Sequence, residues 1–234
     1  MDASSPKDFA SRLSTVADEA EAVLDIPRGR IAVIPEAPAP ALHARTVEEV
    51  AAVRHRFSLP DRYLVWVGAM QTPDPRKRVA PLTRATRSMP LVLVGPTARW
   101  AHELRDVKLT GAVSDDELAA IYTGAHALVF PSDDEGFGLP PVEALACGTP
   151  VAASDVPALR EVLEGRAILR AVDDLNGLIA AAEAAERPAP PPPAWTWVDA
   201  AHTTLQVYRE AAEETDCWQS VRPKHRAATL VKDA

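Results

Sequence analysis

The chain has 234 residues, 47% of them hydrophobic and 25% charged, which is enough for one well-packed core and a fragment of a second. Its net charge of −8 argues against general nucleic-acid binding, because a nucleic-acid surface needs cations to neutralise phosphates. No apolar run approaches the ~20 residues of a membrane span, and the N-terminus lacks the charged and apolar regions of a signal peptide. We therefore expect a cytoplasmic protein without a transmembrane segment, associated with a membrane at most peripherally.

The first part of the chain predicts a small unit followed by a linker. Residues 7–25 carry apolar side chains at helical spacing, and residues 30–35 form a short apolar run typical of a strand. Residues 36–41 alternate alanine with proline, which favours an extended linker. A further helix is expected over residues 46–57.

From Tyr63 onward, apolar strands alternate with helices. The expected strands span residues 63–68, 91–95, 107–110, 127–130, 150–153 and 167–169. The expected helices span residues 79–86, 100–104, 115–125, 142–146, 157–163 and 175–185, and Ser114 with Glu117 forms a capping box before the third of these. Continuous apolar strands separated by helices indicate a parallel sheet covered on both faces, which is an α/β, Rossmann-like fold.

The pattern changes again near residue 187. Residues 187–197 form a proline-rich connection, residues 198–215 predict a closing helix, and residues 216–234 are polar without a clear period. We expect this last segment to be loosely ordered.

Residues 130–151 carry the strongest chemical signal, Phe-Pro-Ser-Asp-Asp-Glu-Gly-Phe-Gly-Leu-Pro-Pro-Val-Glu-Ala-Leu-Ala-Cys-Gly-Thr-Pro-Val. An apolar strand leads into a glycine turn, and two prolines then open a helix. Free backbone N–H groups and the helix dipole converge at such a turn and make it an anion site. Glu135 and Glu143 stand on either side of the turn. A phosphate seat between two hydrogen-bond acceptors suits a nucleotide-sugar, which joins a diphosphate to two hydroxyl-rich rings.

The same stretch resembles the signature of the family-four retaining glycosyltransferases, which have the GT-B fold. The matching segments are P-S-x-x-E-G-F-G-L-P followed by E-A-L-A-C-G-T-P-V. Outside them, Val67-Gly68 with Pro75-Arg76-Lys77 resembles the family's first strand and its P-R-K-N loop, and residues 91–95 resemble its next strand. Trp197 and the pair Tyr208-Arg209 resemble the family's closing helix, so the resemblance covers residues 60–212.

Enzymes of this family have two Rossmann-like domains with the active site between them. The resemblance implies that residues 41–186 are the C-terminal, nucleotide-sugar-binding domain. Residues 1–40 resemble only the end of the N-terminal acceptor domain and its linker, so most of that domain is missing from this chain.

Residue roles follow from the resemblance at matching positions. Glu143 is expected to accept hydrogen bonds from the ribose hydroxyls. Glu135 is expected to face the transferred sugar and to stabilise positive charge at the anomeric carbon, with a covalent nucleophile as the less favoured reading. Lys77 is expected to neutralise the leaving diphosphate, and Arg76 either shares that task or supports the loop.

The glycine turn is expected to bind through its backbone. Gly136, Phe137, Gly138 and Leu139 would present N–H groups to the diphosphate or the sugar, while the Phe137 side chain by itself indicates core packing. Two positions depart from the family pattern. Ala69 stands where many relatives carry an arginine, and Arg78 stands where the P-R-K-N loop has asparagine. Base recognition is expected to use backbone groups near Val113 and after Gly95.

No metal or other cofactor is expected. No Asp-x-Asp motif lies at a strand end, and Asp115 and Asp116 belong to a helix cap. The histidines show no clustered ligand spacing, and Cys147 and Cys217 lie far apart. Lys77 and a helix dipole could supply the charge that a metal otherwise supplies.

Two functions remain open from the sequence. The first is a metal-independent, retaining glycosyltransferase that moves a hexose from a nucleotide-diphospho-sugar to a saccharide, lipid or small-molecule acceptor. The second is a truncated nucleotide-sugar-binding module, inactive alone or dependent on a separately encoded acceptor domain. A nucleotide-sugar epimerase of the same fold is a weaker third reading, because the signature and the P-R-K loop match transferases better.

Overall fold

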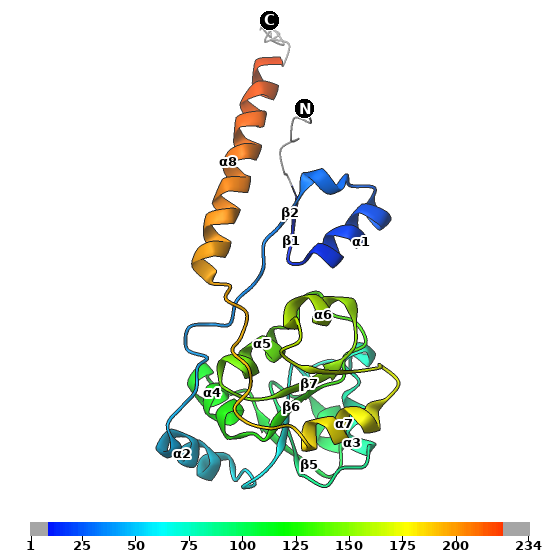
Figure 1. The fold of residues 1–234 in the computed structure, drawn as a ribbon, viewed down its shortest axis with the longest axis vertical. Coiled ribbons are helices and arrows are strands. Elements are labelled where there is room, and N and C mark those ends of the chain that lie inside the picture. The colour runs from blue at the N-terminus through cyan, green and yellow to red at the C-terminus, as the bar shows by residue number, and fades with distance from the viewer. Residues whose placement is uncertain (1–8, 222–234) are drawn as a thin grey trace, which may run out of the picture.

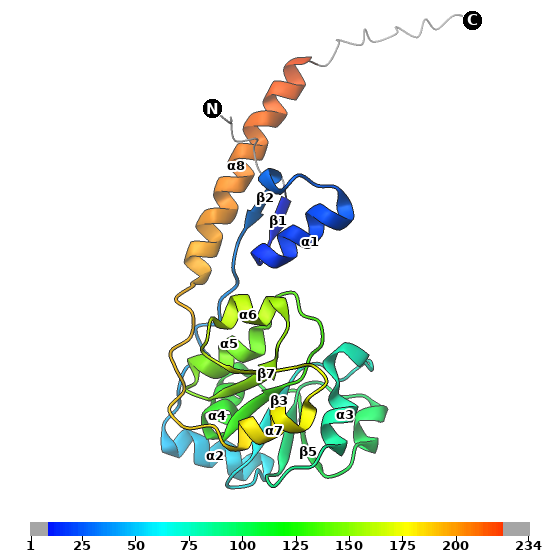
Figure 2. The same cartoon turned by 45° about the vertical axis from the view of Figure 1, so that its right-hand side comes forward.

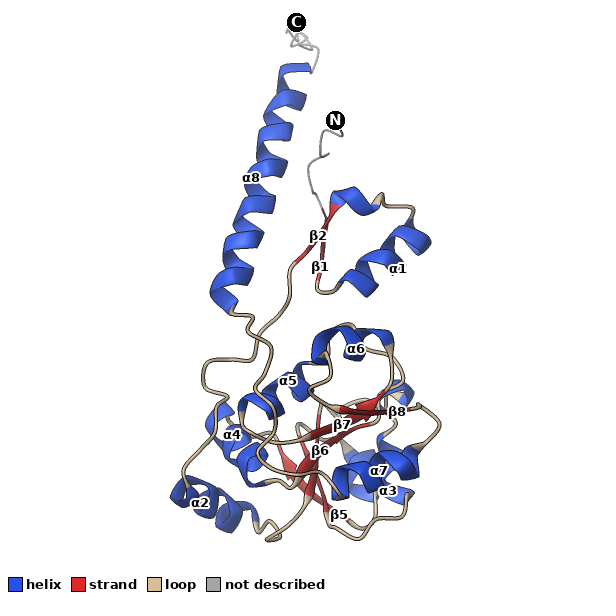
Figure 3. Ribbon diagram, in the orientation of Figure 1, coloured by secondary structure: helices blue, strands red, loops and turns tan. Residues whose placement is uncertain are grey.

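The computed structural model describes the backbone of residues 9–221 and the side chains of residues 10–213. Its main body is a parallel sheet with helices on both faces, and a small unit and a long helix project from one side of it (Figure 1 and Figure 3). The strands are β1 (Phe9–Ser11), β2 (Ile31–Val33), β3 (Leu64–Val67), β4 (Leu91–Val94), β5 (Val107–Gly111), β6 (Ala127–Phe130), β7 (Val151–Ser154) and β8 (Ile168–Arg170). The α-helices are α1 (Ser14–Leu24), α2 (Val47–Phe57), α3 (Val79–Arg84), α4 (Asp115–Gly124), α5 (Leu139–Ala146), α6 (Pro157–Leu163), α7 (Leu175–Glu183) and α8 (Trp197–Val221). The 3₁₀ turns are η1 (Arg28–Arg30), η2 (Pro75–Lys77) and η3 (Arg99–Glu103).

The main sheet has six strands in the order β5-β4-β3-β6-β7-β8, and every neighbouring pair is parallel. The chain starts in the middle at β3, winds outward to β5, then returns to the other side of β3 with β6. This is the doubly wound order, and its direction reverses between β3 and β6. In such sheets the crevice beyond the carboxyl ends of the two reversing strands is where ligands bind.

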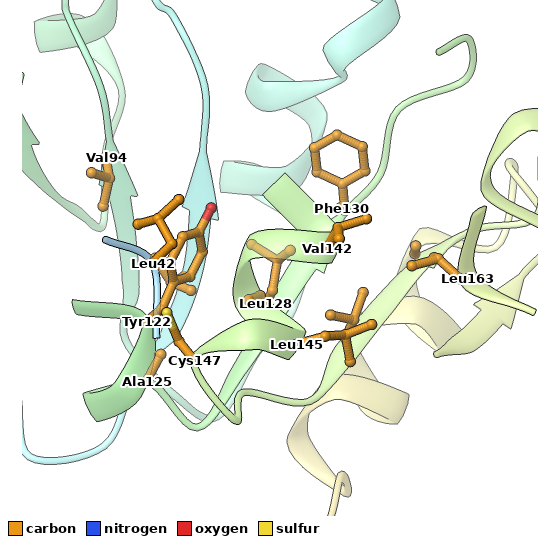
Figure 4. Close-up of a cluster of buried hydrophobic side chains, with 14 of the residues drawn as sticks. Leu42, Val94, Tyr122, Ala125, Leu128, Phe130, Val142, Leu145, Cys147 and Leu163 are labelled. Atoms are coloured by element: carbon orange, nitrogen blue, oxygen red, sulfur yellow. The ribbon is translucent and has the colours of Figure 1, made fainter. Parts of the chain in front are cut away.

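Both faces of the sheet are buried, and alternate residues of each strand point to opposite faces. On β3, Val65 joins the core that contains residues of α4, α5 and α6, whereas Leu64 and Trp66 join the core that contains residues of α3 and α7. Strands β4, β6 and β7 divide their residues in the same way. Figure 4 shows part of the first core, in which Leu128 and Phe130 of β6 pack near Val142 and Leu145 of α5.

The elements predicted between residues 63 and 185 are present, with ends shifted by no more than three residues. The segment predicted as a helix over residues 100–104 is the 3₁₀ turn η3. The capping box predicted at Ser114 is formed, since the Ser114 hydroxyl accepts from the Glu117 N–H and the Glu117 side chain accepts from the Ser114 N–H. The α/β, Rossmann-like fold is therefore confirmed.

Two predictions at the ends of the chain need correction. The helix expected over residues 7–25 begins only at Ser14, and Phe9–Ser11 is strand β1, which pairs in parallel with β2. Helical spacing of apolar residues could not reveal this, because the pairing depends on a strand about twenty residues away in sequence. The closing helix expected over residues 198–215 is α8, which continues to Val221, so its end was placed too early; residues 222–234, in the segment expected to be loosely ordered, lie outside the described part.

The unit β1-α1-β2 lies beside α6, and α8 projects on the same side of the main body (Figure 1 and Figure 2). Leu13 at the start of α1 is buried in the core that also contains residues of α6, and Ala17 is buried as well, while Val23 and Leu24 at the end of α1 are exposed. None of the helices in the described part of the chain is long and apolar enough to cross a membrane.

Candidate functional site

Two loops meet beyond the carboxyl ends of β3 and β6, where the sheet reverses direction. The loop after β3 ends in η2, and the loop after β6 leads to α5. The Asp133 N–H donates to the Arg76 carbonyl oxygen at 2.9 Å, and the Arg76 guanidinium lies 3.3 Å from the Asp134 carboxylate. These contacts bring together two segments that lie more than fifty residues apart in the sequence.

Lys77 lies at the end of η2 and is half-buried. Its Nζ is 3.4 Å from the Ala69 carbonyl oxygen, a long contact that leaves the ammonium able to bind another acceptor. A cavity of about 360 Å³ lies beside it, lined by residues of the loop after β3, among them Ala69, Thr72 and Asp74. The lysine is close enough to Glu135 for its charge to act on the pKa of that carboxyl. The structure therefore brings Lys77 and Glu135 to the same place.

Arg76 is held by carboxylates on both sides. Its Nε and Nη2 lie 3.2 Å and 3.0 Å from the two carboxylate oxygens of Asp74, and its Nη1 lies 3.3 Å from Asp134. The Arg76 side chain lowers the pKa of Asp74, chiefly through this hydrogen bonding. The two carboxylates already balance the charge of Arg76, and the ion pairs join the loop after β3 to the loop after β6. This geometry favours a role for Arg76 in supporting the loop over direct binding of the diphosphate.

Glu135 is half-buried in the loop before α5. Burial raises the pKa of its carboxyl, and the charge of Asp134 adds to the rise, while Ser132, Lys77 and Arg76 oppose it. Ser132 is fully buried, and its hydroxyl has no hydrogen-bond partner of ordinary geometry among the described residues. The Ser132 hydroxyl is thus a polar group at the base of the loop that sequence reasoning did not single out, although it belongs to the P-S-x-x-E motif.

The turn before α5 keeps its amides free. The N–H groups of the four residues 136–139 donate no hydrogen bond within the described part of the chain. The second and third residues of α5 are prolines, which have no N–H group. The donors for an anion at this helix end are therefore the loop amides rather than the next turn of the helix.

Gly138 and Phe137 fix the shape of this turn. Gly138 caps α5 with φ of 89°, and a Cβ there would lie 2.5 Å from Leu159 Cδ2. Gly136 differs, because a Cβ there would meet nothing within 4 Å. The Phe137 side chain is only 2% exposed and packs on Trp195 with ring centroids 5.7 Å apart, so the side chain belongs to the core and only the backbone N–H is left for a ligand.

Glu143 lies further along α5 and faces α4. The Tyr122 hydroxyl donates to Glu143 Oε2 at 3.1 Å. Burial raises the pKa of Glu143, the bond from Tyr122 opposes this rise, and the charge of Asp115 adds to it. Glu135 instead has Lys77 and Asp134 as neighbours, so the two carboxylates face different surroundings on either side of the α5 N-terminus.

The sequence did not identify Tyr122 as part of this site. Its position in α4 indicates only a buried apolar face, and twenty-one residues separate it from Glu143. The packing of α4 against α5 brings the hydroxyl to the carboxylate.

A second cavity, with a volume of about 890 Å³, lies elsewhere in the described part of the chain. Its lining residues precede β4 and β5, at the amino ends of these strands and the opposite edge from the two loops: Thr83–Pro90 and Glu103–Asp106. Among the residues that the structure describes, no group of three or more His, Cys, Asp or Glu side chains could hold a metal ion.

The profile of the family described as Glycosyl transferases group 1 matches residues 47–186. The O-antigen chain mannosyltransferase of Salmonella typhimurium is 51% identical over 73 residues, which cover 31% of this chain and 21% of that protein. The MMP alpha-(1->4)-mannosyltransferase of Mycolicibacterium hassiacum is 44% identical over 89 residues, or 34% of this chain and 22% of that protein. The D-inositol 3-phosphate glycosyltransferase of Mycobacteroides abscessus is 31% identical over 172 residues, or 65% of this chain and 36% of that protein.

Solved structures share the fold across most of the chain. Sucrose-phosphate synthase from Thermosynechococcus elongatus aligns with a TM-score of 0.59 at 24% identity, covering 91% of this chain and 57% of that one. Anabaena HepE, solved in complex with UDP-glucose, aligns with a TM-score of 0.62 at 14% identity, covering 91% of this chain and 63% of that one. The chain thus spans about three fifths of these solved chains and 21–36% of the curated relatives above.

Proposed function

Because the chain belongs to the Glycosyl transferases group 1 family, we propose that it is the donor-binding half of a retaining, metal-independent glycosyltransferase. The donor is a nucleotide-diphospho-sugar. The observation that carries this proposal is that Lys77 lies close to Glu135, directly before the free amides of residues 136–139, at the reversal point of the sheet. A cation and a row of N–H groups at the carboxyl ends of parallel strands suit a diphosphate.

Each side chain then has a chemical task. The bond between the anomeric carbon and the diphosphate oxygen breaks as the acceptor hydroxyl approaches on the same face, and the departing phosphate oxygen takes the proton of that hydroxyl. Lys77 and the loop amides stabilise the negative charge that grows on the diphosphate. The Glu135 carboxylate accepts from the sugar hydroxyls and stabilises the positive charge on the ring. Glu143 accepts from the two ribose hydroxyls, which orients the nucleoside.

The relatives suggest which donors to examine first. The matched proteins from Salmonella typhimurium and Mycolicibacterium hassiacum are named mannosyltransferases. We propose that a hexose is transferred, with mannose as the first candidate, to a saccharide, lipid or small-molecule acceptor.

A second candidate, a binding module that lacks turnover by itself, is favoured by the small β1-α1-β2 unit. Parallel sheets of only two strands are unusual on their own, and although Ile31 and Ala32 of β2 are buried, α1 leaves Val23 and Leu24 79% and 64% exposed. We propose that residues outside this chain complete this unit and supply most of the acceptor side. The chain alone would then bind the donor and transfer nothing.

The proposal is tested by donor binding. Purified chain should gain thermal stability with one of UDP, GDP or ADP, or with their sugars, because a ligand that binds the native state raises Tm. Lys77→Ala should weaken binding of that diphosphate about 10-fold or more, the usual loss of a charge-assisted contact. Arg76→Ala is the matched control, and it should weaken binding less, since Asp74 and Asp134 already occupy the guanidinium. The absence of binding by every nucleotide, or equal losses in both variants, would contradict the proposed site.

A further inference from the structure

Tyr122 is a buried tyrosine whose hydroxyl reaches a carboxylate of the candidate site. The residue is fully buried, and its hydroxyl donates to Glu143 Oε2 at 3.1 Å. Figure 4 shows its ring beside Cys147 in the core between α4 and α5. The other carboxylate oxygen of Glu143, Oε1, makes no hydrogen bond within the described part of the chain. One oxygen is therefore held by the protein, and the other is available to a ligand.

The backbone that carries Tyr122 is fixed from two directions. The hydroxyl of Thr149, in the Gly-Thr-Pro turn, donates to the Tyr122 carbonyl oxygen. The Tyr63 hydroxyl, on the strand side, donates to the Ile121 carbonyl oxygen at 2.7 Å. Thr149 and Tyr63 are 0% and 1% exposed, so water does not compete for these bonds. These buried hydrogen bonds hold the backbone at Tyr122, and with it the position of the tyrosine ring.

Building on the proposed ribose role of Glu143, we propose that Tyr122 is a positioning residue for donor binding. Its hydroxyl fixes one carboxylate oxygen of Glu143 so that the other faces the ribose diol. The tyrosine itself does not touch the donor. A carboxylate that is already oriented loses less side-chain entropy when the nucleoside binds, and this raises affinity.

The charges around Glu143 give the proposal a measurable signature. Burial and the nearby Asp115, on α4, both raise the pKa of Glu143, and Tyr122 opposes them. On α5 itself, burial raises the pKa of Cys147 to about 12, so its thiol stays neutral, and Arg45 acts on Cys147 rather than on Glu143. Tyr122 is thus the one described group that favours the ionised form of Glu143.

The direction of the pH effect follows from these contacts. Glu143 accepts from the ribose as a carboxylate, so its contribution to binding is present above its pKa and is lost as the pH falls through it. Without the Tyr122 hydroxyl, nothing among the described contacts opposes the rise in the pKa of Glu143 caused by burial and Asp115. The pH at which half of the ribose contribution to binding is lost must then move higher.

Tyr122→Phe removes only the hydroxyl. Calorimetric titration of the full chain with the tightest of UDP, GDP and ADP should show affinity about 3- to 10-fold weaker than in the wild type at neutral pH, the usual effect of one lost hydrogen bond. The 2′,3′-dideoxy form of the same diphosphate should bind both proteins equally. The acid midpoint for the ribonucleotide should lie at higher pH in the variant.

Tyr63→Phe is the matched control. It removes a buried tyrosine hydroxyl that bonds to the residue next to Tyr122, but that hydroxyl does not reach Glu143. It should lower Tm by an amount similar to Tyr122→Phe but weaken affinity less, because Thr149 still holds the Tyr122 backbone, and it should leave the pH dependence of binding unchanged. If both variants change affinity alike, the effect comes from general loosening of α4 and the positioning role is wrong.

The outcomes separate this inference from the proposed function. If the wild type binds no nucleotide, both fail together. If it binds but does not distinguish ribose from dideoxyribose, the ribose role of Glu143 fails and the inference with it. If the wild type distinguishes them and Tyr122→Phe does so equally well with the same midpoint, only the inference fails.

Should Tyr122→Phe not fold, 3-fluorotyrosine can be introduced at position 122 instead. Its hydroxyl is a stronger hydrogen-bond donor, so the acid midpoint of binding should move to lower pH, and an unchanged midpoint would overturn the proposal.

Discussion

Two residues with positive φ shape the backbone on either side of the candidate site. Gly138 caps α5 with φ of 89°, and Arg78 caps α3 with φ of 50°. Glycine adopts this conformation freely, and asparagine is the next most tolerant residue, whereas other side chains are disfavoured there. The family's P-R-K-N loop has its asparagine at the position of Arg78. Here the Arg78 guanidinium donates to the Val172 carbonyl oxygen, which helps to hold the strained conformation.

Gly138→Ala should destabilise the protein by about 1–3 kcal/mol, because the substitution combines an unfavourable φ with a contact between Cβ and Leu159. Urea unfolding would measure the change. Gly136→Ala is the control from the same turn. It has open space around its Cβ position and no positive φ, so it should stay within about 0.5 kcal/mol of the wild type. Equal losses in both variants would show that the turn is constrained at Gly136 as well.

At the scale of elements, α1 depends on a residue from another part of the molecule. Its N-cap residue, Leu13, has no side chain that could accept a hydrogen bond. Instead, the two carboxylate oxygens of Glu161 on α6 accept from the Ser14 and Thr15 N–H groups at 2.7 Å and 2.9 Å. A carboxylate at a helix N-terminus also interacts favourably with the helix dipole. Glu161 therefore joins the β1-α1-β2 unit to the main body.

Partial burial of Glu161 would raise its pKa, but the bonds from Thr15 and Ser14 outweigh burial, and the net pKa is lowered. A lowered pKa means that this contact is fully present above the ordinary carboxyl range and is lost as the pH falls through the folded-state value. The attachment of α1 should therefore persist at neutral pH and weaken only in acid.

Glu161→Ala should loosen the first turn of α1 while leaving the main sheet intact. Hydrogen exchange at pH 7 would show faster exchange at Ser14 and Thr15, with unchanged protection of β3 and β6, because only the cap has been removed. Glu164→Ala, at the end of the same helix, is the control. Its carboxylate pairs locally with Arg166 and does not reach α1. Unaltered exchange in the Glu161 variant would mean that packing alone holds the unit.

At the scale of the whole molecule, the segment after α7 crosses back over the main body before α8 begins. Arg187 donates to the carbonyl oxygens of Ala125 and Gly148, and the Ala189 N–H donates to Gly148 as well. Trp195 then packs on Phe137, directly behind the glycine turn. The proline-rich connection therefore supports the site from behind and links it to α8.

Trp195→Ala should destabilise the main body by about 1–3 kcal/mol, because it removes a half-buried aromatic side chain from Phe137. Thermal unfolding followed by circular dichroism would measure it. Trp197→Ala removes the same side chain two residues later, where the tryptophan is 45% exposed, and should change stability by no more than about 0.5 kcal/mol. A larger loss of stability in Trp197→Ala than in Trp195→Ala would mean that the tryptophan important for stability is the one in α8.

The sequence was sufficient for the elements of the main body and for the location of the glycine turn. Apolar strands alternate with helices there, and turn and cap residues such as Gly138 and Ser114 mark element ends locally. It failed at β1, because strand pairing with β2 is long-range, and it placed the end of α8 too early. The roles of Lys77, Glu135, Glu143 and the turn residues stay predictions.

By itself, the amino-acid sequence determined the order of strands and helices, the two buried faces of the sheet and the free amides before α5, since these depend on neighbouring residues and on period. Only the tertiary structure decided which distant side chains meet. It tied Arg76 to Asp74 and Asp134, turned Glu143 toward Tyr122, and used Glu161 to cap α1. Such contacts arise when parallel strands bring their carboxyl ends to one edge and helices pack across the sheet, and neither event leaves a local pattern along the chain.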